Sequence, residues 1–240
     1  TWRRTSRIWK TTNTRMSSLI VYNTPGWITA FTTGKGCGVE DVGLSLQQLA
    51  LPRQTNSDHI LRVTQPGRPE DTDAVITSQP GLCVCVKTAD CIPVLLYDDQ
   101  ERQVAAVHAG WRGTVAHIAA QTASLMNPQG KHLHAIIGPG ISLAQFEVGD
   151  EVYEAFRQAG FPMNLISRKF PSNQGADKWH IDLWESNRLQ LIEAGVHPDH
   201  ISTAGICTFL HHDRFFSARR LGIASGRILS GIMLHEGGRQ

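Results

Sequence analysis

Two reactive side chains, Cys91 and His108, stand at the ends of neighbouring apolar segments of this sequence. Cys91 follows Asp90 and precedes the run IPVLL, and His108 ends the run VAAVH just before Gly110. A thiolate and an imidazole brought together can bind a metal, or they can act as nucleophile and base. A lone cysteine in such a run would more often be a small buried hydrophobic residue. The nearby histidine favours a functional site, with both chemistries open.

The segment between these residues predicts a hairpin. The stretch 98–103 is wholly polar and separates two apolar runs, as expected of a turn between antiparallel strands. Such a hairpin would set Cys91 and His108 at opposite strand positions, where Cβ atoms are about 4.5–5.5 Å apart. A helix predicted after Gly113 would add free N–H groups beside Arg112. The sequence therefore predicts an anionic substrate, phosphate included.

Composition restricts the classes of partner. The formal charge of +2 is small for 240 residues, and much of the positive excess lies in the first ten, so a polyanion is not expected. No window approaches the roughly 20 apolar residues of a membrane span. The five cysteines are odd in number and no secretory signal precedes them, which favours reduced thiols or metal ligands over disulfides. We expect a cytoplasmic protein that binds neither nucleic acid nor membrane.

The first residues differ in character from the rest. Residues 1–15 are basic and hydroxyl-rich, and Met16 follows them. We interpret 1–15 as a non-native or disordered extension, with a transit peptide as the weaker alternative, and 16–240 as a single catalytic domain.

Periodicity predicts mixed elements without a regular βαβ alternation. Helices are expected at Val39–Ala50, Thr114–Met126, Glu151–Ala159 and Ile181–Ala194. Strands are expected within Leu19–Thr33, Arg53–Val63, Ala74–Thr77, Cys83–Thr88, Ile92–Tyr97, Val104–His108, Leu133–Ile137, Ile201–Ile206 and Ile223–Leu234. This pattern indicates one α+β domain with a mixed or antiparallel sheet core flanked by helices.

Several motifs carry a resemblance to a known family. KTADCIPVLLYD, VAAVHAGWRGT, IIGPGISLAQFEVGDEV, CTF and FFSARR closely resemble the YfiH or multicopper polyphenol oxidase family, also described as laccase-domain proteins and purine nucleoside phosphorylases. The resemblance extends from about Ile28 to the C-terminus. It implies a zinc site of one cysteine and two histidines, in which Cys91 and His108 match two ligands.

This chain differs from the family at the third ligand of the implied zinc site. Its motif, QVH or QTH, reads Gln54-Thr55-Asn56 here, and an amide oxygen is a poorer zinc ligand than imidazole. His59 is a candidate substitute, although in a strand position 59 faces away from position 56. Three outcomes stay open: a weakened site of Cys91, His108, Asn56 and water, which we favour; recruitment of His59; or a metal-free thiol site.

The resemblance implies phosphorolysis of adenosine, inosine or guanosine, with adenosine deamination as a further activity and copper-dependent phenol oxidation in some members. Arg112 would hold phosphate oxygens, and Asp90 would shuttle protons in deamination. Arg219, Arg220 and Glu147 match family motifs and are candidate substrate-binding residues. Multicopper oxidation needs many histidines, which the sequence does not cluster, although copper could occupy the Cys91 site.

Two alternatives remain. The sheet core resembles that of cytotoxic necrotizing factor, in which a cysteine and a histidine hydrolyse amides, so a metal-free Cys91 would act as the nucleophile of an amidase or deamidase. A non-catalytic binding module would follow from loss of the metal ligand alone. The oligomeric state and the preferred nucleoside or phenol stay open.

Overall fold

The computed structural model describes residues 9–10, 18–172 and 175–237. The helices are α1 (Trp111–Val115), α2 (Ile118–Met126), α3 (Asp150–Gln158), α4 (Met163–Ile166), α5 (Leu183–Glu193) and α6 (Ala218–Leu221). The strands are β1 (Trp9–Lys10), β2 (Ile20–Tyr22), β3 (Ile28–Thr32), β4 (Leu49–Ala50), β5 (Ile60–Arg62), β6 (Ala74–Thr77), β7 (Cys83–Thr88), β8 (Ile92–Asp98), β9 (Gln103–Ala109), β10 (Leu133–Ile137), β11 (Glu147–Val148), β12 (Ser167–Ser172), β13 (Gly175–Ile181), β14 (Ile201–Thr203) and β15 (Ile228–Leu234).

The first large sheet has the order β1-β2-β3-β15-β7-β4 and is antiparallel except for the pair β4–β7. Its centre is β15, which pairs with β3 on one side and β7 on the other. A Cβ on Gly231 of β15 would lie only 2.7 Å from the Cys85 sulfur and 2.8 Å from the Phe31 ring. Glycine at this position therefore lets these two buried side chains of the flanking strands pack over the sheet centre.

The second large sheet has the order β14-β10-β8-β9-β6-β5. The pairs β10–β14 and β5–β6 are parallel, and the other neighbours are antiparallel, which makes the sheet mixed as expected. All seven residues of β8 are buried, because the strand is covered on both faces. The continuous apolar run that follows Cys91 therefore marks the middle of this sheet.

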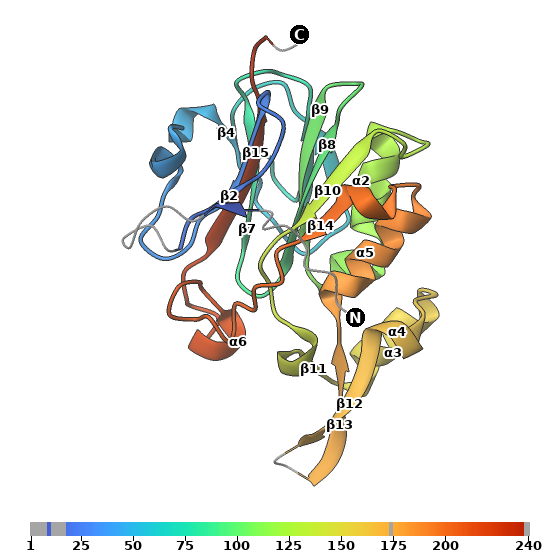
Figure 1. Cartoon of the computed structure of the whole chain (residues 1–240). Coiled ribbons are helices and arrows are strands. Elements are labelled where there is room, and N and C mark those ends of the chain that lie inside the picture. The colour runs from blue at the N-terminus through green and yellow to red at the C-terminus, as the bar shows by residue number, and fades with distance from the viewer. Residues whose placement is uncertain (1–8, 11–17, 173–174, 238–240) are drawn as a thin grey trace.

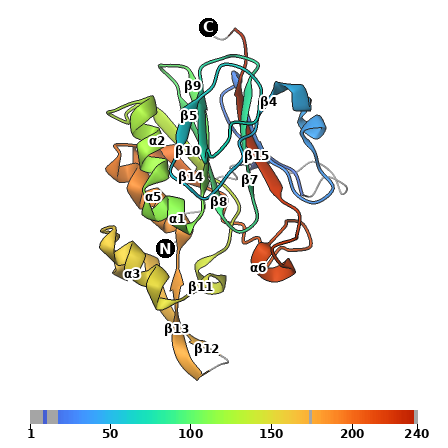
Figure 2. The same ribbon diagram turned by 180° about the vertical axis from the view of Figure 1, so that it is seen from behind.

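The two sheets stack, and helices cover one outer face (Figures 1 and 2). Strands β7 and β15 of the first sheet contact β9 of the second, and a core that includes Val84, Leu95 and Ile232 fills the interface. A larger core lies between the second sheet and the helices. A small third core lies on the outer face of the first sheet, under two 3₁₀ turns, Val39–Val42 and Leu46–Gln48. The predicted single α+β domain is confirmed.

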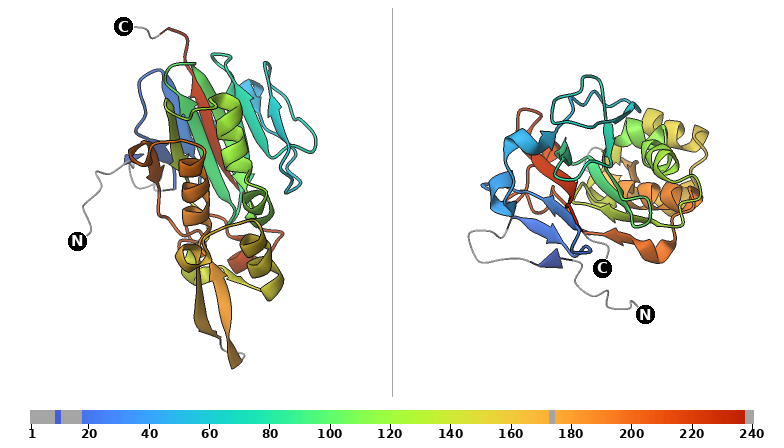
Figure 3. Two further views of the ribbon diagram at one scale, coloured as in Figure 1. Left: turned by 90° about the vertical axis from the view of Figure 1, so that its right-hand side faces the viewer. Right: turned by 90° about the horizontal axis from the view of Figure 1, so that it is seen from above.

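A narrow three-stranded sheet, β11-β13-β12, extends away from these layers (Figure 3). Tyr153 of α3 stacks on Trp179 of β13 with ring centroids 4.0 Å apart, which holds the sheet against the helices. The alternation of β13 is weak, with four exposed residues before Trp179, and the sequence did not predict this hairpin.

Two helix predictions were wrong in detail. The predicted helix Thr114–Met126 begins earlier, at Trp111, and is interrupted at His117, whose φ of 58° is left-handed. The break lets the His117 ring reach the Ala159 carbonyl at 3.1 Å and stack on Phe161. The expected helix Val39–Ala50 is instead two 3₁₀ turns followed by β4, in agreement with its irregular apolar spacing.

Most strand predictions hold, with shorter ends at β14 and β15. The predicted strand Arg53–Val63 was wrong over most of its length, because only Ile60–Arg62 (β5) is a strand and 53–59 form a loop. Of residues 1–15, only Trp9 and Lys10 are described, and they pair with β2; the rest of the predicted extension lies outside the described residues. Within the described ranges, no helix combines the length and apolarity needed to cross a bilayer.

Candidate active site

The β8–β9 hairpin brings Cys91 and His108 to the same end of the second sheet. The register pairs Ile92 with Ala109 and Pro93 with His108. The predicted directly opposite placement was therefore wrong, because the turn makes His108 face Pro93. Cys91 lies two residues before Pro93, so it approaches His108 diagonally, across the position of Gly110.

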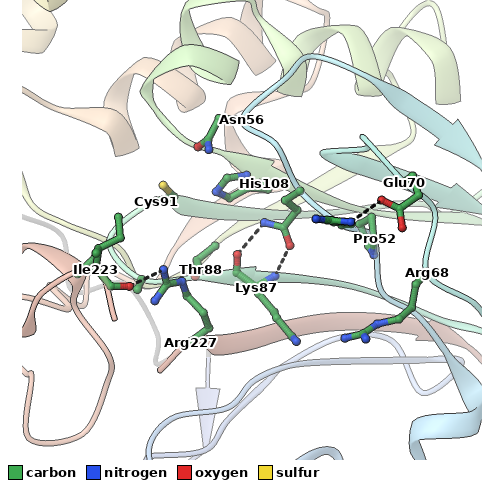
Figure 4. A pocket seen from close by; sticks show the side chains of 14 residues that line it. Pro52, Asn56, Arg68, Glu70, Lys87, Thr88, Cys91, His108, Ile223 and Arg227 are labelled. Carbon is green, nitrogen blue, oxygen red and sulfur yellow. Dashed lines mark hydrogen bonds and ion pairs between the residues drawn. The ribbon is translucent and has the colours of Figure 1, made fainter. Parts of the chain in front are cut away.

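Gly110 leaves the space in which three polar side chains meet. A Cβ at this position would lie 3.1 Å from the Cys91 sulfur, 3.1 Å from Asn56 Oδ1 and 3.7 Å from His108 Cε1. Figure 4 shows the same three side chains together at one end of a cavity. Thiol, amide and imidazole thus converge on one point.

Asp73, a fully buried residue that the sequence predictions missed, orients His108. Its Oδ1 accepts a hydrogen bond from His108 Nδ1 at 2.6 Å, which leaves Nε2 to face the site. Burial alone would raise the pKa of Asp73, but the hydrogen bonds from His108 and Ser57 outweigh it and lower the pKa to about 2. Burial would likewise lower the pKa of His108, yet attraction to the Cys91 thiolate and the bond to Asp73 raise it to about 9.

The same carboxylate fixes the backbone beside Asn56. Asp73 accepts N–H bonds from Thr55, Asn56 and Ser57, at 3.1, 3.2 and 2.8 Å, and a further bond from the Ser57 hydroxyl. Asn56 has a φ of 62°, a left-handed conformation that asparagine tolerates better than most residues. One buried carboxylate therefore positions both His108 and Asn56.

A second anchor ties this loop to the first sheet. The Gln54 amide accepts a hydrogen bond from the Lys87 N–H at 2.8 Å and donates one to the Lys87 carbonyl at 2.7 Å. The Gln54 side chain thus forms the pair of hydrogen bonds that a neighbouring strand would form with β7. The loop that contains Gln54 leads from β4 in the first sheet to β5 in the second.

The cavity has a volume of about 690 Å³ and a strongly cationic lining. Arg53, Arg68, Lys87 and Arg227 contribute four positive charges, whereas Glu70 is the one carboxylate among the lining residues and pairs with Arg53 at 3.4 Å. Carbonyls of the preceding turn hold the Arg227 guanidinium, including Ile223 at 3.1 Å and Gly226 at 3.0 Å. The lining suits an anionic ligand or cosubstrate.

Two predicted residues lie elsewhere. His59 is exposed, and its Nδ1 contacts Asp71, so the structure does not bring it to Cys91 and His108. Arg112 is exposed on α1 and stacks over Trp111, outside the cavity lining. Of the N–H groups expected to be free at this helix start, that of Thr114 bonds to the Gly110 carbonyl at 2.8 Å.

The remaining predicted residues, Asp90, Glu147, Arg219 and Arg220, are not among the residues that line the cavity. Both oxygens of Asp90 are occupied, by the Thr208 hydroxyl and by the Arg219 N–H, each at 2.7 Å, so Asp90 fixes the start of α6. Arg219 binds the Glu147 carbonyl, and both residues line a shallower hollow. Arg220 lies over the Phe209 ring and lines neither hollow.

The donors at the convergence point fit a metal with one weak ligand. Cys91 offers a thiolate, His108 offers Nε2 with Nδ1 fixed by a carboxylate, and Asn56 offers an amide oxygen. Among the described residues, His, Cys, Asp and Glu side chains alone form no group of three that could hold a metal. The third donor at this point would be the Asn56 amide oxygen.

The family model described as multi-copper polyphenol oxidoreductase laccase matches residues 37–235. This chain therefore belongs to that family, and the resemblance inferred from its motifs is confirmed.

Two relatives illustrate the activities named in this family. A protein named purine nucleoside phosphorylase from Bacteroides thetaiotaomicron is 50% identical over 204 residues, which cover 79% of this chain and 74% of the relative. A protein named adenosine deaminase RL5, from an unknown prokaryotic organism, is 42% identical over 80% of this chain and 77% of its own length.

Solved structures show the same fold. The YfiH protein of Bacillus licheniformis superposes with a TM-score of 0.82 at 26% identity, over 90% of this chain and 96% of that structure. YlmD from Geobacillus stearothermophilus gives a TM-score of 0.84 at 24% identity, over 95% and 99%. The layered arrangement of two sheets and one helical face is thus that of YfiH and YlmD.

Proposed function

We propose that this protein is a cytoplasmic purine nucleoside phosphorylase that uses inorganic phosphate. The observation that carries the proposal is the convergence of Cys91, His108 and Asn56 at one end of a cavity whose lining is cationic. A nucleoside is uncharged, so a cation of this lining, Arg227, suits the phosphate cosubstrate. The name of the Bacteroides relative supports the same reaction.

In this reaction a phosphate oxygen attacks C1′ of the ribose. The bond from C1′ to the purine nitrogen breaks, its electron pair leaves with the purine, and the purine takes up one proton. Arg227, which its turn holds in place, would orient the phosphate near the Cys91 end. Asp73 would keep His108 in one tautomer and one orientation.

Cys91, His108 and Asn56 would hold the metal, zinc or copper. When bound, the metal would supply Lewis-acid stabilisation of negative charge. Because its third ligand is an amide, we expect this chain to hold the metal less tightly than a protein with histidine there. Phenol oxidation by several coppers would need further ligand groups, which the described residues do not supply.

Release of hypoxanthine from inosine, with and without phosphate, tests the proposal. The proposal predicts release that requires phosphate and is lost in Cys91→Ala. Release of equal size without phosphate would indicate hydrolysis and contradict it. With adenosine, ammonia release would report the deaminase activity named for RL5. Asp90, the proton shuttle predicted for that reaction, accepts bonds from the Thr208 hydroxyl and the Arg219 N–H and is not among the residues that line the cavity.

A second candidate rests on the arrangement Cys91, His108 and Asp73. Without a metal, His108 lies between the Cys91 sulfur and the buried Asp73 carboxylate, and against the effect of burial these two groups raise the pKa of His108 to about 9. That is the arrangement of a cysteine nucleophile, its base and the group that orients the base. An amidase or deamidase would show phosphate-independent turnover that a thiol alkylator blocks and a chelator leaves intact.

A further inference from the structure

Two of the cavity's cations have no carboxylate partner among the described residues. Arg53 is paired with Glu70, and Arg227 is held by carbonyls. Arg68 and Lys87 also line the cavity, and no ion pair of the described residues includes either side chain. Two unpaired cations in one lining repel each other until an anion lies between them.

These two cations lie apart from the Cys91 end. In Figure 4, Cys91, His108 and Asn56 lie in the upper part of the view, whereas the Lys87 and Arg68 side chains end in its lower part, with Arg227 nearer to Cys91. Lys87 is anchored through its main chain to Gln54, and its side chain forms no ion pair with the residues that the structure describes. The cavity thus has two separate cationic positions.

A buried hydroxyl lies along the same wall. Thr88 is 1% exposed and lines the cavity, and its Oγ1 has no hydrogen-bond partner in the described part of the chain. Leaving such a group unsatisfied costs stability, so it marks a position where a ligand would bond. In Figure 4 Thr88 lies between Cys91 and Lys87, which places it along a ligand that spans both ends.

We propose that Lys87 and Arg68 form a second anion subsite, which binds the 5′-phosphate of a purine nucleoside 5′-monophosphate. The inference rests on the proposed phosphorolysis and adds a substrate class to it. The base and C1′ would lie toward Cys91, the sugar beside Thr88, and the 5′-phosphate between Lys87 and Arg68. With inosine 5′-monophosphate the attacking phosphate forms a bond to C1′, and hypoxanthine and ribose 1,5-bisphosphate leave.

The first experiment compares binding of inosine and inosine 5′-monophosphate by calorimetry in the absence of inorganic phosphate. We expect the parent to bind the monophosphate at least about tenfold more tightly, the size expected of charge-assisted hydrogen bonds. Lys87→Ala and Arg68→Ala should each remove most of that preference and leave inosine binding unchanged. Lys131→Ala, which removes an exposed lysine outside the cavity, is the matched control and should keep it.

The second measurement compares kcat/KM for both compounds with saturating phosphate. The same variants should reduce the ratio of monophosphate to inosine, whereas Thr88→Val should weaken both substrates alike. Equal binding of both compounds by the parent would overturn the subsite. The proposal would also fall if Lys87→Ala and Arg68→Ala weakened only inorganic phosphate, because the two cations would then serve the cosubstrate.

The subsite and the proposed function fail in different ways. If the enzyme does not cleave inosine with phosphate, phosphorolysis is wrong, yet the calorimetric preference for the monophosphate still decides the subsite. If inosine is cleaved and the preference is absent, the subsite alone is wrong.

Discussion

The two segments that build the site hold their side chains by different means. The β8–β9 hairpin is a regular ladder in a strand pair that is almost wholly buried, with His108 inside β9 and Cys91 directly before β8. The loop from Pro52 to His59 carries Asn56 outside any strand, and the side chains of Asp73, Gln54 and Asp71 form hydrogen bonds that hold it. Main-chain hydrogen bonds and burial hold the hairpin, whereas a few polar side-chain contacts hold the loop. Single substitutions should therefore displace the loop without disturbing the rest of the structure.

Asp73→Asn tests this difference with the largest expected effect. The change weakens the bonds to Thr55, Asn56 and Ser57 and lets His108 adopt the other tautomer, so we expect a loss of about 10- to 100-fold in metal affinity or activity. Metal titration and phosphorolysis rates measure it. Asp99→Asn, which alters an exposed carboxylate beside His132 and His134 outside the cavity lining, should leave both near the parent values; an equal loss in both variants would contradict the assigned role of Asp73.

Gly110→Ala changes the point at which both segments meet. Its φ of −69° suits alanine, so the added Cβ acts by crowding Asn56 Oδ1 and the Cys91 sulfur at 3.1 Å. We expect about a tenfold loss of activity with a small change in unfolding free energy. Gly26→Ala, where no atom lies within 4 Å of the added Cβ, is the control; matched activity of the two variants would show that the three groups do not converge.

Gln54→Ala separates the loop from β7 and leaves the hairpin intact. The substitution removes two hydrogen bonds to the main chain of Lys87, each contributing about 0.5–1.5 kcal/mol to stability. We expect a loss of a few-fold in kcat/KM, together with faster amide hydrogen exchange in residues 53–57. Unchanged exchange there would mean that the loop is held without Gln54, by Asp73 and by the main-chain bond from Arg53 to Pro69.

The pH dependence of unfolding gives the smallest effect. In metal-free protein the depressed pKa of Asp73 adds stability that is present above its usual value of 3.8 and is lost as pH falls toward about 2. The raised pKa of His108 adds stability that is complete below 6.5 and is lost as pH rises through about 9. Urea unfolding should show the largest difference between parent and Asp73→Asn between about pH 4 and 6.5. A difference that does not vary with pH would exclude an ion pair.

The hairpin could be predicted because its signals are local. Two apolar runs around a polar turn define β8 and β9, and both strands appear within one residue of their predicted bounds. Register could not be predicted to the residue, since it depends on how the turn closes, and His108 therefore faces Pro93. Cys91 and His108 nevertheless share a site, because both side chains lie close to the position of Gly110, which has no side chain to separate them.

The cavity was harder to predict because its parts are distant in the sequence. Arg68, Lys87 and Arg227 come from a loop, from β7 and from the turn before β15, and no local spacing connects them. A signal for Asp73 did exist, since a carboxylate directly before the buried run AVIT must find partners when it is buried. Arg112 was favoured because it follows His108 in sequence, but it projects from the exposed side of α1.

The most direct test of the account is the metal content of three proteins after dialysis against the same chelator. We predict that the parent loses most of its zinc or copper and that Asn56→His keeps about one ion per chain, because histidine is a stronger ligand and tolerates the left-handed conformation of position 56. The double variant Asn56→His, Cys91→Ala should keep none. Equal retention by the parent and Asn56→His, or retention without Cys91, would contradict a metal site of Cys91, His108 and a weak third ligand at Asn56.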